Sequence, residues 1–418
     1  MAILKNGVWF MGATVPRFHV FFLHRIMTEY YLLPYVLAAF MMTRSVSQRC
    51  KEESMAEQAK LLVADLMACV PIVSLTRNVV SNRRYWKAVK NADIKSITYT
   101  QPLIDIFFLS LAKPAELAHQ MSTEVEGTFE VAEASLYTKT WTPQGPVKAQ
   151  VIHVHGFSDH INWYDDVYRI LASSGIQVFG FDQRGWGRSV KQPSDKGNTG
   201  ATPRVIADIA AFIESKLPSD VPVFVLGHSM GGGEVLTLAA DPQYAKLVSQ
   251  VRGWILEAPF IGFAPEEVPS WFKIVAGRLA CKILPRFQLK HQLDVMNLTR
   301  KPEVAKGFKE DPLCHDTGTL EGLASLLDRT AALQSGSIKL GKEVKSLWLG
   351  HGDHDKACSY EAAMEFAKNQ DIDDKVVKTY VGGYHALHVD LCQEEYAKDI
   401  TAWILDRSTG ERPIEAKL

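Results

Sequence analysis

The pentapeptide Gly-His-Ser-Met-Gly at residues 227–231 limits the possible folds of this 418-residue chain more than any other feature. It follows an apolar run at residues 222–227 (PVFVLG) and precedes a helix-like stretch at residues 232–240. Glycines two positions before and after a serine let the backbone turn sharply, so that the hydroxyl projects from the sheet edge. The helix start also offers the N–H of Met230 to a developing oxyanion. We therefore predict that Ser229 is a nucleophile between a strand and a helix.

The rest of the chain from about residue 121 alternates between strand-like and helix-like patterns. Short apolar runs with strand character lie at residues 149–155, 176–182, 253–257, 346–350 and 375–381, and residues 129–141 alternate as a pair of strands would. Helix-like segments such as residues 163–173 separate them. This order predicts a mostly parallel, doubly wound sheet with the chemistry at the strand C-termini. Combined with the serine turn, it indicates the α/β-hydrolase fold.

We predict three parts: an N-terminal extension at 1–119, a hydrolase domain at 120–410 and a tail at 411–418. Residues 259–345 show no strand signal, only helical and irregular patterns rich in Leu, Phe and Pro. The insertion lies between the strand that follows Ser229 and the later strands. We therefore expect it to cross above Ser229 as a helical lid with an apolar stripe that includes Trp271.

The N-terminal extension contains four apolar blocks, at residues 8–15, 18–42, 61–75 and 103–112. Arg25 and Glu29 interrupt the second block, and its clean remainder is shorter than the ~20 residues that a membrane-spanning helix needs. Two interpretations are favoured, an interfacial membrane anchor and helices that pack on the hydrolase domain, and a true membrane span is the third. In all three, the extension is largely helical.

The charge balance excludes one class of partner. The chain has 46 Lys and Arg against 47 Asp and Glu, so it lacks the basic excess that phosphate neutralisation requires, and we expect no nucleic-acid partner. Its six cysteines are widely spaced without a C-x-x-C pair, which is typical of reduced thiols in an intracellular protein. No pattern indicates the oligomeric state.

A serine nucleophile needs a histidine base and an acid that orients it, and in this fold their chain order is Ser, Asp or Glu, then His. Two aspartates, Asp353 and Asp355, follow the strand-like run at 346–350. Two histidines, His385 and His388, follow the run at 375–381. The residues alone leave both choices open.

The second oxyanion donor should come from the loop after an early strand, where the N–H of Phe157 is the candidate. His155 precedes the serine, which is the wrong order for a base, so we interpret it as a residue that stabilises this loop. His351, His354 and His385 do not follow a zinc-binding spacing. We expect neither a metal nor a cofactor, because the triad needs none.

These motifs resemble those of the monoacylglycerol lipase family of serine hydrolases, which includes lysophospholipases. Residues 227–232 (GHSMGG) match the nucleophile motif unchanged, and residues 182–189 (DQRGWGRS) resemble the family's D-x-x-G-x-G-x-S. Residues 155–160 (HGFSDH) resemble H-G-x-x-E-H, with Asp159 in place of Glu. Asp355 fits G-x-x-D and His385 fits Y-H-x-L-H, so the resemblance selects these two over Asp353 and His388. The similarity covers roughly residues 121–407.

The resemblance implies a triad of Ser229, Asp355 and His385, with Phe157 and Met230 as oxyanion donors. It implies cleavage of long-chain fatty-acyl esters, a monoacylglycerol first and a lysolipid as the alternative, under a lid that contacts a membrane or lipid droplet. An acyltransferase or thioesterase with the same triad is the other possibility. We expect a cytoplasmic protein attached to membranes. The C-terminal tripeptide Ala-Lys-Leu (416–418), similar to the Ser-Lys-Leu peroxisomal signal, indicates the peroxisome as a second possibility.

Overall fold

A computed structural model describes residues 122–409 of the chain. The predicted extension at 1–119 and the tail at 411–418 lie outside the described residues. The division of the chain into these three parts therefore stays a prediction.

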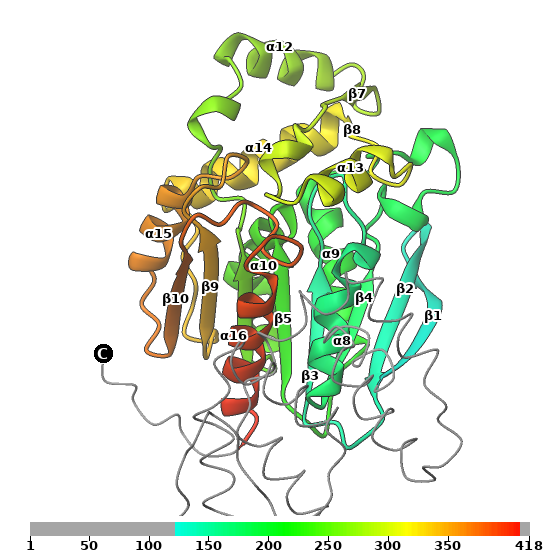
Figure 1. Cartoon of the computed structure of the whole chain (residues 1–418). Coiled ribbons are helices and arrows are strands. Elements are labelled where there is room, and N and C mark those ends of the chain that lie inside the picture. Colours follow the sequence, from blue (N-terminus) through cyan, green and yellow to red (C-terminus); the bar gives the residue numbers. More distant parts are fainter. Residues whose placement is uncertain (1–121, 410–418) are drawn as a thin grey trace, which may run out of the picture. The chain divides into compact units, whose positions relative to one another are not determined.

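An eight-stranded sheet forms the centre of the described domain, in the order β1-β2-β4-β3-β5-β6-β9-β10 (Figure 1). β1 and β2 form an antiparallel hairpin, β2 pairs antiparallel with β4, and every later pairing is parallel. The strands are β1 (Ser122–Val131), β2 (Ala134–Pro143), β3 (Ala149–Val154), β4 (Ile176–Phe181), β5 (Val223–His228), β6 (Gly253–Glu257), β9 (Leu347–Gly352) and β10 (Lys375–Tyr380). The predicted α/β-hydrolase fold is confirmed.

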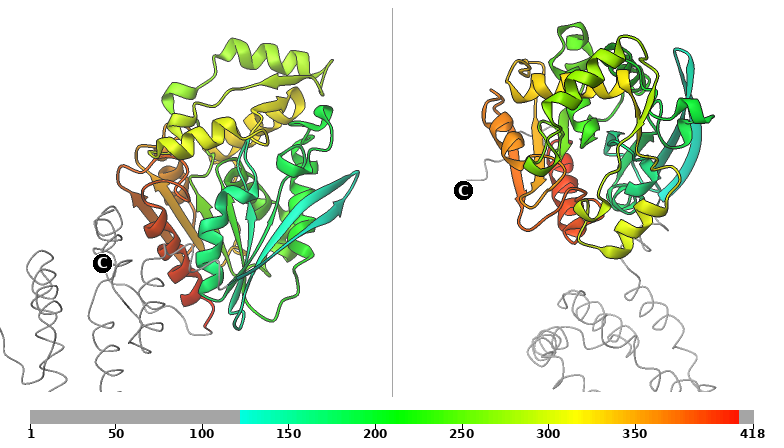
Figure 2. Two further views of the ribbon diagram at one scale, coloured as in Figure 1. Left: turned by 45° about the vertical axis from the view of Figure 1, so that its right-hand side comes forward. Right: turned by 90° about the horizontal axis from the view of Figure 1, so that it is seen from above.

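Helices cover both faces of this sheet, so its central strands are buried on both sides (Figures 1 and 2). One hydrophobic cluster joins α8 and α16 to the sheet, and a second joins α9, α10, α11 and α15 to it. All six residues of β5 are buried, which explains why this strand appears in the sequence as an unbroken apolar run. The helices are α8 (Asp165–Ser173), α9 (Thr202–Glu214), α10 (Met230–Ala240), α11 (Ala245–Val248), α15 (Tyr360–Lys368) and α16 (Gln393–Asp406).

The insertion between β6 and β9 lies above the carboxyl ends of the parallel strands, as predicted for a lid (Figure 2). Its helices are α12 (Trp271–Cys281), α13 (Pro302–Glu310) and α14 (Leu320–Gln334). The prediction that it contains no strand is wrong. Gln288–Lys290 (β7) and Thr317–Thr319 (β8) form an antiparallel pair. Three-residue strands are too short to show an alternating pattern, so they cannot be recognised from the residues alone.

The first and last helices of the insertion differ in how they are attached. Arg329 of α14 donates a hydrogen bond to Glu234 of α10 at 3.0 Å, and both side chains are buried. A second bond at 3.1 Å joins Arg329 to Thr202 at the start of α9. In contrast, α12 has no buried residue, and an exposed ion pair between Arg278 and Asp328 links it to α14. α14 is therefore part of the domain core, while α12 lies over it.

Candidate active site

Ser229 occupies the sharp turn between β5 and α10. Its backbone has φ +53° and ψ −118°, a conformation that costs a non-glycine residue about 1–3 kcal/mol. The surrounding backbone holds it there, because the Ser229 N–H donates to Glu257 O at 3.0 Å and Ser229 O accepts from the Phe260 N–H at 2.8 Å. The turn therefore has the strained geometry that the sequence motif predicts.

The motif glycines permit this turn because neighbouring backbone passes where side chains would be. A Cβ on Gly227 would lie 2.7 Å from Gly231 O, and a Cβ on Gly231 would lie 2.2 Å from Val154 O. A Cβ on Gly232 would lie 2.8 Å from Pro259 Cα. Each glycine is thus needed for close approach of the nucleophile turn to β3 and to the chain after β6.

Asp355 lies in the loop after β9, and its carboxylate is fully buried. Oδ1 accepts the N–H groups of Ala357 at 2.8 Å and Cys358 at 3.0 Å, while Oδ2 accepts from His385 Nδ1 at 2.7 Å and His351 Nε2 at 2.8 Å. Burial alone would raise the pKa of Asp355. The charge and hydrogen bonds of His385 and His351 outweigh burial and hold the pKa well below its usual value.

The Asp353 side chain bonds to His354 and Gly382 instead of to the candidate base. Its Oδ1 accepts from His354 Nδ1 at 2.7 Å and from the Gly382 N–H at 2.6 Å, and its side chain remains 28% exposed. The residue thus joins the loop after β9 to the loop after β10 without contacting His385. Of the two aspartates, Asp355 has the geometry of a residue that orients the base.

His385 lies in the loop after β10 and lines the same cavity as Ser229. Burial lowers its pKa, but the Asp355 carboxylate outweighs this effect and raises the pKa well above the ordinary histidine value. The Ser229 hydroxyl contacts Cys358 Sγ at 3.8 Å, and in the described residues no hydrogen bond joins it to His385. Completing the triad requires the serine hydroxyl to turn from Cys358 toward His385 by a change of side-chain rotamer.

The second histidine of this loop, His388, is hydrogen-bonded to Glu257 at the end of β6. Its backbone N–H donates to Glu257 Oε1 at 3.0 Å, and its ring Nδ1 donates to the same oxygen at 2.7 Å. Its ring stacks on Tyr164 with centroids 3.9 Å apart. The Tyr164 hydroxyl contacts His228 Nδ1 at 2.7 Å and donates to Asp159 Oδ2 at 2.5 Å. His388 is therefore bonded to a buried polar network rather than to the acid.

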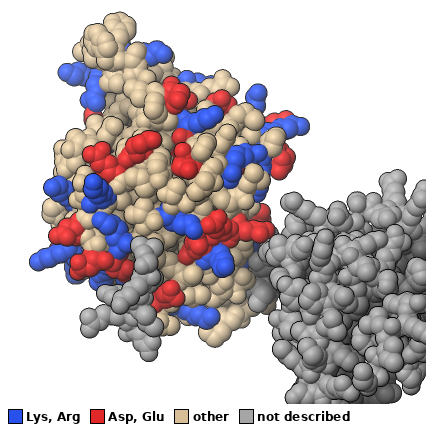
Figure 3. Space-filling model, turned by 60° about the vertical axis from the view of Figure 1, so that its left-hand side comes forward, with Lys and Arg blue, Asp and Glu red and all other residues tan. Residues whose placement is uncertain are grey.

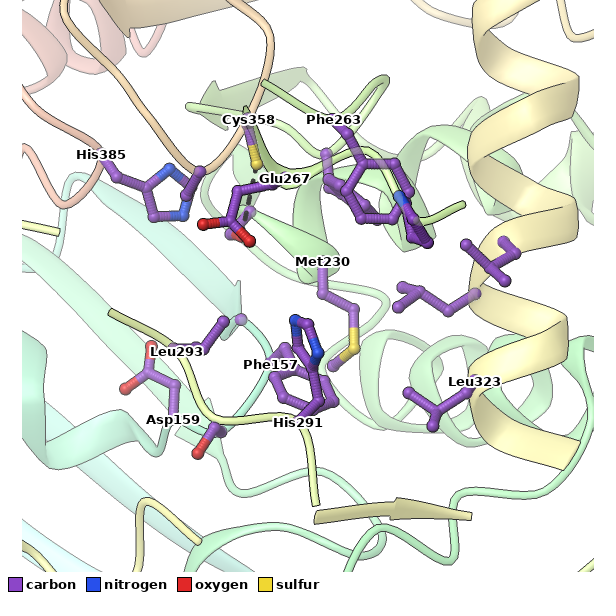
Figure 4. A pocket seen from close by; sticks show the side chains of 18 of the residues that line it. Phe157, Asp159, Met230, Phe263, Glu267, His291, Leu293, Leu323, Cys358 and His385 are labelled. Atoms are coloured by element: carbon purple, nitrogen blue, oxygen red, sulfur yellow. Dashed lines mark hydrogen bonds between the residues drawn. The ribbon is translucent and has the colours of Figure 1, made fainter. Parts of the chain in front are cut away.

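The loop after β3 brings Phe157 beside the nucleophile. A Cβ on Gly156 would lie 3.1 Å from the Cβ of Ser229, and both Phe157 and Met230 line the cavity (Figure 4). His155 holds this loop as predicted, because its Nδ1 donates to Gly156 O at 2.8 Å and its Nε2 accepts from Gln183 N at 2.8 Å. The backbone N–H groups of Phe157 and Met230 therefore come from the two segments that the oxyanion prediction requires.

The cavity above Ser229 has a volume of about 360 Å³ and mostly apolar walls. Ile274 of α12, Leu289 of β7, and Leu323 and Leu327 of α14, all from the insertion, contribute apolar side chains to its wall. In Figure 4, His385 and Cys358 lie at one end, and Leu323 projects inward from α14. A long apolar group attached to a reacting carbonyl matches this arrangement.

Comparison with known proteins assigns the chain to a family. A family model described as serine aminopeptidase, S33, matches residues 145–391. A Schizosaccharomyces pombe relative named for monoglyceride lipase is 31% identical over 290 residues, which span 68% of this chain and 75% of the relative. The monoglyceride lipase of Homo sapiens is 29% identical over 280 residues, 65% of this chain and 88% of that protein.

The chain belongs to the monoglyceride lipase family of α/β-hydrolases. Its fold is similar to that of a soluble variant of the Saccharomyces cerevisiae monoglyceride lipase, solved in complex with a substrate analogue. The TM-score is 0.61 at 22% identity, and the similarity covers 69% of this chain and 98% of that one. The catalytic roles of Ser229, Asp355, His385, Phe157 and Met230 stay predictions, which the geometry described above supports.

Two features of the candidate active site were not predicted from the sequence. Cys358 lies beside Ser229, and its position three residues after Asp355 was the one available signal. Glu257 accepts hydrogen bonds from His388 and Tyr396, but a carboxylate at the end of an apolar strand carries no motif. Asp159, which stands in place of the family's Glu, accepts hydrogen bonds from the Tyr164 hydroxyl and from the His160 N–H at 2.7 Å.

We expect Asp355→Asn to lower kcat about 10⁴-fold, because an amide at this position favours the wrong tautomer of His385. Asp353→Asn should lower kcat less than about tenfold, since this carboxylate does not contact the base. Steady-state hydrolysis of one ester by both purified variants, with Ser229→Ala as the inactive reference, measures the difference. Equal losses in the two aspartate variants would contradict the assignment of Asp355.

Proposed function

We propose that this protein hydrolyses fatty-acyl esters, with long-chain monoacylglycerols as its main substrates. The observation that carries the proposal is the apolar cavity of about 360 Å³ that joins Ser229 and His385 to the underside of the lid. The names of its relatives support the same substrate class. No cofactor enters the proposed reaction.

In the proposed reaction, His385 accepts the proton of Ser229 while the serine oxygen bonds to the ester carbon. The N–H groups of Phe157 and Met230 stabilise the resulting oxyanion, and losing such a donor typically costs about 10²–10³ in kcat. When the intermediate collapses, the carbon–oxygen bond to glycerol breaks and His385 returns the proton to the leaving oxygen. Water activated by His385 then cleaves the acyl-enzyme to release the fatty acid.

The apolar walls predict selectivity for long acyl chains. Each buried methylene contributes about 0.8 kcal/mol, so four additional buried methylenes correspond to roughly 200-fold in kcat/KM. We expect monooleoylglycerol to exceed a butyrate ester by at least this factor, measured as fatty-acid release by the full-length protein. Ser229→Ala is the control for background hydrolysis. A preference for short soluble esters would replace the lipase proposal with a general esterase.

A lysolipid is the second candidate substrate because Lys273 and Lys290 line the same cavity from the lid. An ammonium group at each position can pair with the phosphate of a lysolipid head group. Hydrolysis of lysolipids and monoacylglycerols with the same acyl chain, compared side by side, separates the two substrates. Acyl transfer would appear in the same assays as a new acyl ester in place of free fatty acid, and thioester cleavage is tested by adding a long-chain acyl thioester as a third substrate.

We also propose that the lid binds a lipid surface. Large apolar side chains on and beside α12 are exposed, including Trp271 at 74% and Ile283 at 80%. Residues 268–293 contain five basic residues and no acidic one, namely Lys273, Arg278, Lys282, Arg286 and Lys290. In Figure 3 the lid at the top carries blue side chains around an uncharged knob. This combination suits an anionic lipid surface. Among the described helices, none is long and apolar enough to span a membrane.

We expect Trp271→Asp to narrow the preference for long-chain over short-chain esters, because it places a carboxylate on the lipid-facing side of α12. The ratio of long-chain to short-chain ester hydrolysis, measured in the presence of phosphatidylcholine vesicles with and without phosphatidylserine, tests this expectation. Val125→Asp alters a 58%-exposed apolar residue of β1 and provides the matched control. Equal activity of wild type and Trp271→Asp on both vesicle types would exclude the lid as the binding surface.

We propose that the protein acts at cytoplasmic membranes or lipid droplets, and we regard the peroxisome as the alternative location. The exposed apolar lid supports the first location, whereas the C-terminal tripeptide, which lies outside the described residues, supports the second. Imaging of an N-terminally tagged protein with and without residues 416–418 compares them. We expect a membrane-associated pattern in both cases, and peroxisomal signal that depends on the tripeptide would contradict this expectation.

A further inference from the structure

Three potential metal ligands that lie far apart in the sequence meet beside the oxyanion loop. His160 ends the loop that carries Phe157, while Asp311 and Cys314 follow α13. The ligand atoms of these three residues all lie within 4.8 Å of one another. His160 Nε2 is 2.9 Å from Asp311 Oδ2. These residues provide one nitrogen, one oxygen and one sulfur donor.

The local fold holds these donors in place. Asp311 Oδ1 accepts the Leu313 N–H at 2.9 Å, which leaves Oδ2 for His160. The Cys314 N–H donates to Asp311 O at 3.1 Å, so a tight turn brings the thiol back toward the carboxylate. Trp163 stacks on Phe308 of α13 at 3.9 Å and thereby packs the two segments against each other. The cluster is therefore part of a packed junction.

The electrostatic surroundings of this junction favour a cation. Burial raises the pKa of the Cys314 thiol, and the carboxylates of Asp159, Asp311 and Asp316 raise it further. Burial lowers the pKa of His160, but Asp311 and Asp159 outweigh burial and raise it. The carboxylate contributions to both pKa shifts act in the direction expected of negative potential at the cluster. A divalent ion bound by one thiolate, one carboxylate and a neutral imidazole would leave no net charge.

Two other clusters in the described residues are less suited to an ion. The cluster of His228, Glu257 and His388 is fully buried, and the Glu257 carboxylate already accepts three hydrogen bonds. The cluster of Asp355, Cys358 and His385 is the candidate active site itself. In contrast, the Asp311 side chain is 21% exposed and Cys314 is half-buried, so solvent can reach the first cluster.

We propose that His160 Nε2, Asp311 Oδ2 and Cys314 Sγ form a binding site for Zn²⁺, with a water molecule as the fourth ligand. Zinc binds N, O and S donors at about 2.0–2.3 Å in tetrahedral geometry, which requires neighbouring donors to lie roughly 3.4 Å apart. His160 and Asp311 need to separate by only a few tenths of an ångström. Binding releases the Nε2 proton of the His160 imidazolium, which leaves a neutral ring protonated at Nδ1, and the proton of the Cys314 thiol, and it involves no redox step. The bound ion would join the oxyanion loop to the segment after α13.

Binding can be tested with Co²⁺ as a spectroscopic probe on the reduced full-length protein. We expect one equivalent to bind, with a thiolate-to-cobalt charge-transfer band and the d–d bands of a tetrahedral ion, and Zn²⁺ to abolish both. Cys314→Ser should eliminate the charge-transfer band. Asp311→Asn should raise the Kd for Co²⁺ at least about tenfold, since even residues that only hydrogen-bond to a metal ligand change metal affinity about 10–100-fold.

Cys392→Ser is the matched control, because Cys392 is also half-buried and its Sγ lies 3.9 Å from the Asp390 carboxylate. It should retain the charge-transfer band and the Kd of wild type. Addition of Zn²⁺ should raise the melting temperature of wild type and of Cys392→Ser, but not that of Cys314→Ser. A band that survives Cys314→Ser, or the absence of stoichiometric binding at micromolar Co²⁺, would overturn the proposal. Circular dichroism of each variant distinguishes loss of the site from loss of the fold.

Discussion

The strained backbone of Ser229 is the constraint on which the rest of the site depends. A non-glycine residue keeps this conformation only where its surroundings leave no alternative. Here the surroundings are the carbonyl oxygens at the end of β3 and the chain that leaves β6, both packed against motif glycines. Because β3 also begins the oxyanion loop, the same packing fixes the spacing between the nucleophile and Phe157. The sheet thus positions two elements of the site through one contact.

Below this turn, a buried polar network links the loops that carry the other groups. Glu257 at the end of β6 accepts from His388 in the same loop as His385, and His388 stacks on Tyr164 next to Asp159. Burial raises the pKa of a carboxyl group, yet the neighbouring histidines hold the pKa of Glu257 at about 2. Removing one partner would leave a buried charge or donor unsatisfied, which is costly. The loops after β3, β6 and β10 are consequently fixed relative to one another.

Sequence patterns predicted the features that repeat locally and missed those that depend on distant contacts. The run at 222–227 corresponds to β5 (Val223–His228), and the run at 346–350 corresponds to β9 (Leu347–Gly352), because a buried parallel strand is an unbroken apolar segment. The choice between Asp353 and Asp355 was not available from local pattern and required the family motif. The bond between His388 and Glu257 spans 131 residues and that between His160 and Asp311 spans 151, so no spacing rule could indicate either.

The different attachment of α12 and α14 determines how the cavity can change shape. If α14 withdrew, Glu234 would remain buried without Arg329, a loss of about 3–5 kcal/mol for such a pair. The polar link between α12 and α14 is a solvent-exposed ion pair, which contributes about 1 kcal/mol or less, and no residue of α12 is buried against α14. The cavity that would hold the acyl chain therefore has a rigid wall formed by α14 and a compliant wall formed by α12. Substrates that differ in length or in the kink of a double bond would be accommodated by displacement of α12, while the reacting carbonyl keeps its place against the rigid side.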